Sequence, residues 1–132
     1  MSQHETIIIL DFGSQVTQLI ARRVREADVY CEIISCHAGV AVVKAKNPKG
    51  IILSGGPASV YAPGAPQIDP ELYKLGVPVL GICYGIQVTA HNTGGTVVKA
   101  EHREFGRTEI ICDVTSPLFA GLPGEQTVWM SH

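Results

Sequence analysis

The sequence predicts an α/β fold: an open, mostly parallel sheet with helices on both of its faces. Two features of the first part of the chain support this fold. Short runs of apolar, often β-branched residues recur there, as expected of strands that are buried on both faces. Helical patterns separate these runs, and a regular alternation of strands and helices is typical of parallel sheets. With 132 residues, the chain is long enough for one ordinary domain, or for part of one.

Apolar runs that end in turn residues define the predicted strands. In the first part of the chain these runs are residues 7–10, 29–34, 50–53 and 77–82. Residues 96–98, 108–114 and 127–130 also have strand patterns, but no convincing helix lies between them. The C-terminal part of the chain therefore differs in character from the alternating part before it.

Helices are predicted where apolar residues recur every three or four positions. The first such pattern consists of Val16, Leu19, Ile20 and Val24. Polar residues fill the positions between them, which predicts an amphipathic helix with one buried stripe. Residues 71–75 form a short predicted helix, and residues 84–92 form a longer one that Gly94 and Gly95 close. The proline-rich segment 58–70 is expected to be a surface loop.

Composition and charge narrow the classes of partner and location. The net charge is −2 and 17% of the residues are charged, so no basic excess is available to bind nucleic acid or an anionic membrane. The N-terminal MSQHET lacks the basic start and apolar run of a signal peptide, and no apolar stretch approaches the roughly 18 residues of a membrane span. We therefore expect a cytoplasmic protein.

The four cysteines, Cys31, Cys36, Cys83 and Cys112, include no C-x-x-C pair. In a reducing compartment they are expected to be free thiols. Cys31, Cys36 and His37 are close in sequence, but no second pair of ligands accompanies them. No metal site is therefore predicted.

Cys83 lies in Gly81-Ile82-Cys83-Tyr84-Gly85, at a predicted strand-to-helix turn. This G-x-C-x-G pattern copies the G-x-S-x-G nucleophile elbow, with sulfur in place of oxygen. The N–H groups that open the following helix would stabilise a thiolate and later an oxyanion. The alternative is that Cys83 is a small buried hydrophobe, because free cysteine is among the most buried residue types. Its position at the junction favours the nucleophile.

A base for this thiol is not evident in the sequence. A general base must come within about 3 Å of the thiol, directly or through one water. His91 is eight residues along the same predicted helix, roughly 12 Å away along its axis. The other histidines lie near the chain ends or in polar, loop-like surroundings; they are His4, His37, His102 and His132. None of them is a clear partner for Cys83.

Five stretches of the chain match one known family in order: residues 8–15 (IILDFGSQ), 50–57 (GIILSGGP), 79–87 (VLGICYGIQ), 103–106 (REFG) and 129–132 (WMSH). With these stretches the sequence resembles class I (triad-type) glutamine amidotransferases, which have a flavodoxin-like architecture. The elbow alone indicates this class. The stretches DFGSQ, REFG and WMSH point to the branch formed by the amidotransferase domain of glutamine-hydrolysing GMP synthase.

The resemblance implies a role for each matching site residue. Cys83 would be the nucleophile that attacks the side-chain carboxamide of glutamine. The backbone N–H groups of Gly56 and Tyr84 would form the oxyanion hole, while Gln87 and the backbone near Ser131 would hold the glutamine, with Gly56 also next to the substrate. No cofactor is implied for this portion.

The resemblance also implies the fate of the products. A thioester on Cys83 would be hydrolysed to glutamate, and ammonia would pass to a synthetase domain or subunit that uses ATP and magnesium to aminate XMP to GMP. A homodimer of the full-length protein is compatible with this family.

The chain departs from the family pattern at its end. In the family a His-Pro-Glu pair supplies the base, and this chain contains no such motif. We therefore expect residues 1–132 to be the N-terminal portion of an amidotransferase domain, with the C-terminal part of the fold and the synthetase domain missing. The alternatives are a catalytically incomplete module that binds a ligand or partner, and an amidotransferase subunit of another biosynthetic complex.

Overall fold

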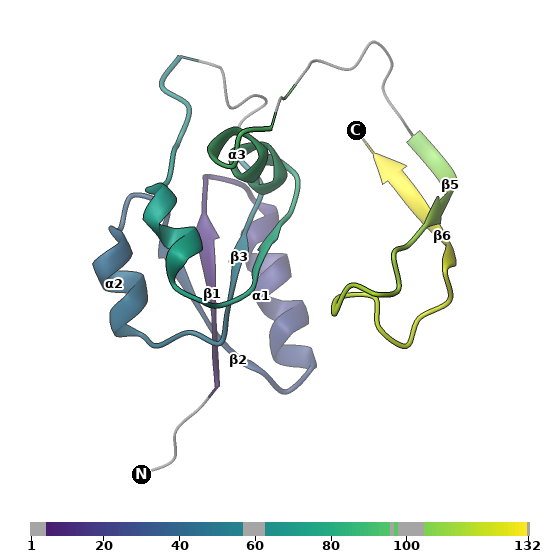
Figure 1. Cartoon of the computed structure of the whole chain (residues 1–132), viewed down its shortest axis with the longest axis horizontal. Helices are drawn as coiled ribbons and strands as arrows, with labels where there is room; N and C mark the ends of the chain where they lie inside the picture. The colour runs from purple at the N-terminus through teal and green to yellow at the C-terminus, as the bar shows by residue number, and fades with distance from the viewer. Residues whose placement is uncertain (1–4, 57–62, 96, 98–104, 132) are drawn as a thin grey trace. The chain divides into compact units, whose positions relative to one another are not determined.

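The computed structural model describes residues 5–56, 63–95, 97 and 105–131, and the chain divides into two units, Met1–Val97 and Val98–His132. The first unit contains, in chain order, β1 (Thr6–Asp11), α1 (Val16–Glu26), β2 (Tyr30–Ser35), α2 (Val40–Ala45), β3 (Gly50–Leu53), the 3-10 helix η1 (Pro70–Lys74), β4 (Val79–Gly81) and α3 (Tyr84–Asn92) (Figure 1). The second contains β5 (Phe105–Ile111) and β6 (Glu125–Ser131). Within the described residues, no helix has the length and apolar character needed to span a membrane.

The four strands of the first unit form one parallel sheet in the order β2-β1-β3-β4. Alternate residues of β1 point to opposite faces of this sheet. Ile8 and Leu10 belong to a core with Val43 of α2 and Val88 of α3, whereas Ile9 belongs to a second core on the side of α1. Helices therefore cover both faces, and the predicted open parallel α/β sheet is confirmed.

The buried stripe of α1 differs from the predicted one. Ile20 and Val24 pack on the sheet as predicted, but Val16 and Leu19 are 41% and 46% exposed. The buried face of α1 instead includes Thr17 and Ala21, which are both buried. Their small side chains let the helix approach the sheet closely, so steric fit selects this face over the more apolar one.

Helix α2 was not predicted from the sequence. Its residues, VAVVKA, are mostly β-branched or small, and β-branched residues have a modest helix propensity. Val43 is 2% exposed and belongs to the core above β1. Burial of this side chain against the sheet outweighs the weak local preference.

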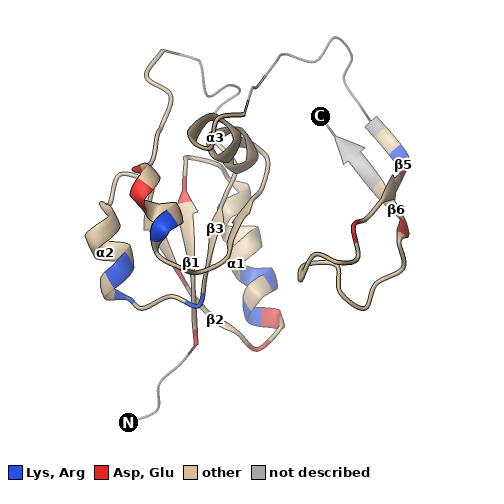
Figure 2. Cartoon of the chain, in the orientation of Figure 1, with Lys and Arg blue, Asp and Glu red and all other residues tan. Residues whose placement is uncertain are grey.

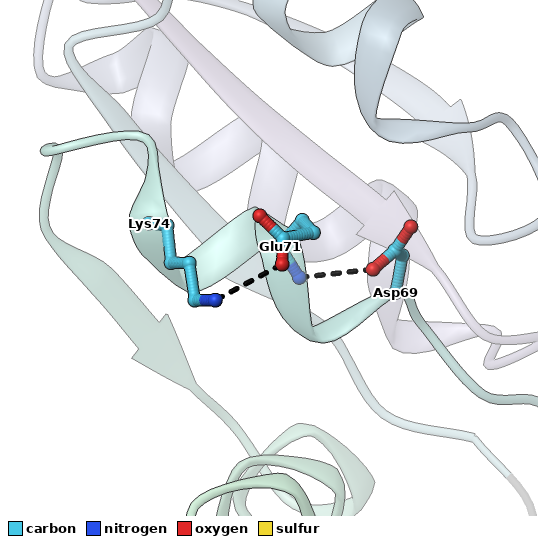
Figure 3. A network of polar contacts seen from close by, with 3 residues as sticks. All are labelled: Asp69, Glu71 and Lys74. Carbon is cyan, nitrogen blue, oxygen red and sulfur yellow. Dashed lines mark hydrogen bonds and ion pairs between the residues drawn. The ribbon is translucent and has the colours of Figure 1, made fainter.

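The connection before β4 is a short 3-10 helix rather than an α-helix. Asp69 caps η1, because its carboxylate accepts a hydrogen bond of 2.9 Å from the Glu71 N–H (Figure 3). Lys74 donates to Glu71 at 3.0 Å on the exposed side, while Leu72 is buried. The following strand is shorter than predicted: β4 begins after Pro78, which has no N–H to donate to a sheet.

In the second unit, β5 and β6 pair antiparallel along their full lengths, from Phe105 opposite Ser131 to Ile111 opposite Glu125. Both strands were predicted, but they begin a few residues earlier than the predicted segments 108–114 and 127–130. The predicted strand 96–98 lies outside the described residues except for Val97, which is not in a strand.

Candidate active site

Cys83 lies where β4 ends and α3 begins. It is the N-cap residue of α3, with φ of 54° and ψ of −116°. A positive φ is uncommon for a residue with a side chain and marks a constrained turn. The cysteine is exposed. The elbow therefore presents the thiol to solvent, and Cys83 is not the small buried hydrophobe of the alternative interpretation.

Glycines flank Cys83 because the turn has no room for side chains at their positions. A Cβ on Gly81 would lie 2.8 Å from the backbone of Gly85. A Cβ on Gly85 would collide with the carbonyl group of Leu53, which also accepts a hydrogen bond of 2.9 Å from the Ile82 N–H. The elbow thus packs directly on the end of β3.

Cys83 lies next to the N-terminus of α3. The first N–H groups of a helix have no partner within the helix. Here the Gly85 N–H donates to the Ile82 carbonyl at 3.0 Å, and the Ile86 N–H donates to the Cys83 carbonyl at 3.0 Å, so the turn before the helix supplies these partners. Helix α3 contains no Lys, Arg, Asp or Glu, so its side chains add no formal charge to the positive end of the helix dipole (Figure 2).

Gly56 lies beside the elbow residue Tyr84. A Cβ on Gly56 would lie 2.7 Å from the Phe12 Cβ and 3.1 Å from the Tyr84 Cδ1. The Phe12 and Tyr84 rings also contact each other, with their centroids 5.4 Å apart at 56°. The structure therefore brings together the two residues from which oxyanion donors were predicted. Phe12, which contacts both, was not singled out from the sequence.

The Tyr84 side chain fixes the start of α3 to the loop before η1. It is 2% exposed, and its hydroxyl donates a hydrogen bond of 2.6 Å to the Pro66 carbonyl. Burial raises the pKa of Tyr84, and the nearby Cys36 adds to this effect. A neutral hydroxyl is the form that donates to a carbonyl, so the raised pKa and the hydrogen bond favour the same state.

Cys36 is a second thiol near this end of the sheet, but its setting differs from that of Cys83. It follows β2, and its N–H donates to the Asp11 carbonyl at 3.0 Å. Burial raises the pKa of the Cys36 thiol, and the Asp11 carboxylate raises it further. These effects favour the unreactive thiol over the thiolate at Cys36.

The remaining predicted site residues occupy different parts of the fold. Gln87 lies in the first turn of α3, four residues after Cys83. Ser131 is the last residue of β6 in the second unit. The glutamine-holding roles of both residues stay predictions.

Two histidines are among the described residues, and neither is in the elbow itself. His91 is in the last turn of α3, and His37 is in the exposed turn after β2. His4, His102 and His132 are outside the described residues. All four cysteines are free, and no group of three His, Cys, Asp or Glu side chains in the described residues is close enough to hold a metal ion.

A buried polar cluster lies beneath this end of the sheet and was also missed from the sequence. Its members are Asp11, at the end of β1, Thr17, in the first turn of α1, and Ser54, directly after β3. Thr17 and Ser54 are 2% and 0% exposed. The sequence signal was present in the DFGS and SGGP turns, but only the fold shows that the turns meet.

A family model for class I glutamine amidotransferases matches residues 8–132. The chain belongs to this family. The amidotransferase family predicted from the motifs is therefore confirmed, and with it the flavodoxin-like architecture of the parallel sheet.

Curated relatives of this amidotransferase chain are GMP synthases described as glutamine-hydrolysing. The protein of Acetivibrio thermocellus is 57% identical over 129 residues, and that of Caldanaerobacter subterraneus is 55% identical over 130 residues. Each alignment covers 98% of this chain and 25% of the relative. The chain thus spans about a quarter of the length of these relatives.

A solved structure shares the fold of this amidotransferase chain. It is a protein of Thermoplasma acidophilum described as one subunit of a GMP synthase, with a TM-score of 0.79 and 31% identity. The match covers 98% of this chain and 65% of the other.

Proposed function

We propose that this chain is the nucleophile-bearing portion of a GMP synthase amidotransferase, which hydrolyses glutamine through a thioester on Cys83. The observation that carries the proposal is the conformation of Cys83: an exposed thiol at positive φ, directly before the N-terminus of α3. This is the geometry that a nucleophile elbow requires. The names of the relatives support the GMP synthase branch, and the family match supports the class of reaction.

In the proposed reaction the Cys83 sulfur attacks the carboxamide carbon of glutamine. The developing oxyanion is stabilised by the N–H groups of Gly56 and Tyr84, whose residues lie side by side. The C–N bond breaks, and the nitrogen takes a proton and leaves as ammonia. Water then cleaves the thioester, releasing glutamate and the free thiol.

The product ammonia would pass to a synthetase domain or subunit that aminates XMP to GMP. ATP and magnesium would bind to that synthetase, and this portion would need no cofactor of its own. The assembly would act in the cytoplasm, and a homodimer of the full-length protein is part of the proposal. A reconstitution assay with a GMP synthase synthetase domain, XMP, ATP and magnesium would test this coupling through glutamine-dependent formation of GMP.

The nucleophile is tested by labelling with a chloroketone analogue of glutamine. The Cys83 sulfur would displace chloride, forming a C–S bond as the C–Cl bond breaks, with the thiol proton passing to solvent. We expect mass spectrometry to find the adduct on Cys83, and we expect excess glutamine to slow its formation. Cys36→Ser is the matched control and should leave labelling unchanged, whereas Cys83→Ser should abolish the adduct.

Labelling of the other cysteines at the same rate as Cys83, with no protection by glutamine, would contradict the proposal. The sequence holds no His-Pro-Glu motif to supply a base. We therefore expect this chain alone to produce little glutamate. Strong glutamate production that disappears in Cys83→Ala would show that the chain has a base of its own.

A further inference from the structure

On the basis of the proposed amidotransferase function, we infer that the buried hydroxyl pair of Thr17 and Ser54 positions the Gly55-Gly56 loop, and thereby the Gly56 oxyanion donor. Neither hydroxyl belongs to the predicted catalytic or glutamine-binding residues. Thr17 is in the first turn of α1, and its hydroxyl reaches Asp11 at the end of β1 and Ser54 directly after β3.

The hydroxyl pair joins three elements of the first unit. Thr17 Oγ1 and Ser54 Oγ are 2.9 Å apart, and Thr17 Oγ1 lies 3.2 Å from Asp11 Oδ1. Ser54 Oγ also lies 2.8 Å from the Leu10 carbonyl oxygen. Helix α1 is thus linked at the same point to the end of β1 and to the residue that opens the Gly55-Gly56 loop.

The supply of protons gives this cluster a direction. The two hydroxyls have one proton each, and a carboxylate only accepts, so the contact between Thr17 and Asp11 uses the Thr17 proton. The Ser54 hydroxyl donates to the Leu10 carbonyl at 2.8 Å, and the same carbonyl, which has two lone pairs, also accepts from the Ser54 N–H at 3.1 Å. Thr17 therefore supplies the proton on its side of the cluster and shares it between Asp11 Oδ1 and Ser54 Oγ.

The same carboxylate oxygen also fixes the turn that packs on the loop. Asp11 Oδ1 accepts a hydrogen bond of 2.8 Å from the Gly13 N–H. Gly13 has a φ of 96°, a conformation that favours glycine. A Cβ on Gly55 would lie 3.1 Å from Ser14 Oγ. A Cβ on Gly56 would lie 2.9 Å from the Phe12 carbonyl oxygen. The turn at residues 11–14 therefore packs against the Gly55-Gly56 loop, while the hydrogen bonds of Ser54 hold the residue at which the loop begins.

Loss of the Thr17 hydroxyl would remove the link from α1 to both sides of the loop, because Asp11 and Ser54 would each lose one hydrogen-bond partner. A small shift of Gly56 would weaken an interaction that forms fully only as the oxyanion develops. Glutamine binding also uses other predicted contacts, Gln87 among them, so it should depend less on the exact position of Gly56. The expected signature is therefore a slower chemical step with nearly unchanged binding.

The test compares Cys83 labelling by the chloroketone glutamine analogue in the parent chain, Thr17→Val and Thr17→Ser. The ketone oxygen of the reagent takes the place of the carboxamide oxygen, so the maximal labelling rate reports the oxyanion site. Iodoacetamide labelling of the Cys83 peptide measures access and intrinsic thiol reactivity without a glutamine group. Thr6→Val is the matched control, because Thr6 is also buried but begins β1 at the opposite end of the sheet.

We expect Thr17→Val to lower the maximal labelling rate about tenfold or more. This loss is smaller than the loss of about 10²–10³-fold that follows removal of a whole oxyanion donor. The concentration for half-maximal rate should stay within about threefold of the parent, and the iodoacetamide rate should not change. Thr17→Ser should restore the rate, and Thr6→Val should match the parent.

A parent-like rate in Thr17→Val would overturn the inference, as would an equal loss in Thr6→Val. If Thr17→Val does not fold, Ser54→Ala replaces it with the same expected signature, and a parent-like rate there would likewise overturn the inference. A parent chain whose Cys83 reacts with iodoacetamide but not with the glutamine analogue would refute the proposed function itself, and the inference with it.

Discussion

At the scale of single residues, Cys83 adopts a backbone conformation that its neighbours make possible. Its positive φ is unfavourable for a residue with a side chain, at a cost of about 1–3 kcal/mol. Gly81 and Gly85 let the turn pack on β3 so closely that the surrounding contacts fix this conformation. The exposed thiol is therefore a consequence of tight packing beneath it.

Substitution Gly85→Ala tests this dependence on close packing. The added Cβ would collide with the Leu53 carbonyl group, and backbone at the end of β3 cannot move away easily. We expect the free energy of unfolding to fall by about 2–4 kcal/mol, measured by urea denaturation. Gly39→Ala is the control, because a Cβ there meets nothing within 4 Å; it should stay within about 1 kcal/mol of the parent. Equal losses in both variants would contradict the packing argument.

Substitution Tyr84→Phe tests the hydrogen bond to Pro66. At neutral pH we expect the free energy of unfolding to fall by about 1 kcal/mol, because the Pro66 carbonyl loses a donor. Since folding raises the pKa of Tyr84 above its ordinary value of 10.0, this contribution is fully present below pH 10. It is lost as the pH rises through the higher pKa of the folded state. Urea denaturation between pH 7 and pH 11 should show the two proteins converging in stability, and a constant difference would contradict the assignment.

At the scale of elements, the sequence predicted those parts whose local pattern and tertiary environment agree. The bounds of β3 and α3 match the predicted segments, because each is a clear apolar or helical pattern between turn residues. Helix α2 was missed because its β-branched residues have no strong local preference, and packing of Val43 decides its structure. The buried face of α1 was predicted only in part: Ile20 and Val24 pack as predicted, but the helix buries Ala21 and leaves Leu19 exposed.

The cap of η1 gives a prediction at the element scale. Asp69→Ala removes the acceptor for the Glu71 N–H and should lower the free energy of unfolding by about 0.5–2 kcal/mol. Asp69→Asn keeps an acceptor oxygen and should lose less. Lys74→Ala breaks only an exposed ion pair with Glu71 and should change stability by less than about 0.5 kcal/mol. Urea denaturation of the three variants checks this order, and a larger loss in Lys74→Ala than in Asp69→Ala would contradict it.

At the scale of the whole molecule, the candidate site divides into a part that sequence could predict and a part that it could not. Cys83 was predicted because glycine spacing at a strand end is a local signal. The packing of Phe12 against Gly56 depends on β1 and β3 being neighbours, with Leu10 opposite Leu53. Strand order and register are set by long-range pairing, so local pattern does not determine them. Support for the elbow therefore becomes visible only in the assembled sheet.

The two units should differ in local stability. In the first unit, β1 is paired on both sides and buries Ile8 and Ile9 completely. In the second, β5 and β6 form a sheet of only two strands, an arrangement that is marginally stable by itself in water. Amide hydrogen exchange in the intact chain, read by mass spectrometry, should therefore show slow exchange in β1 and β3 and much faster exchange in β5 and β6. Equal protection of all four strands would show that β5 and β6 unfold only together with the parallel sheet. The low stability inferred for the two-stranded sheet would then be wrong.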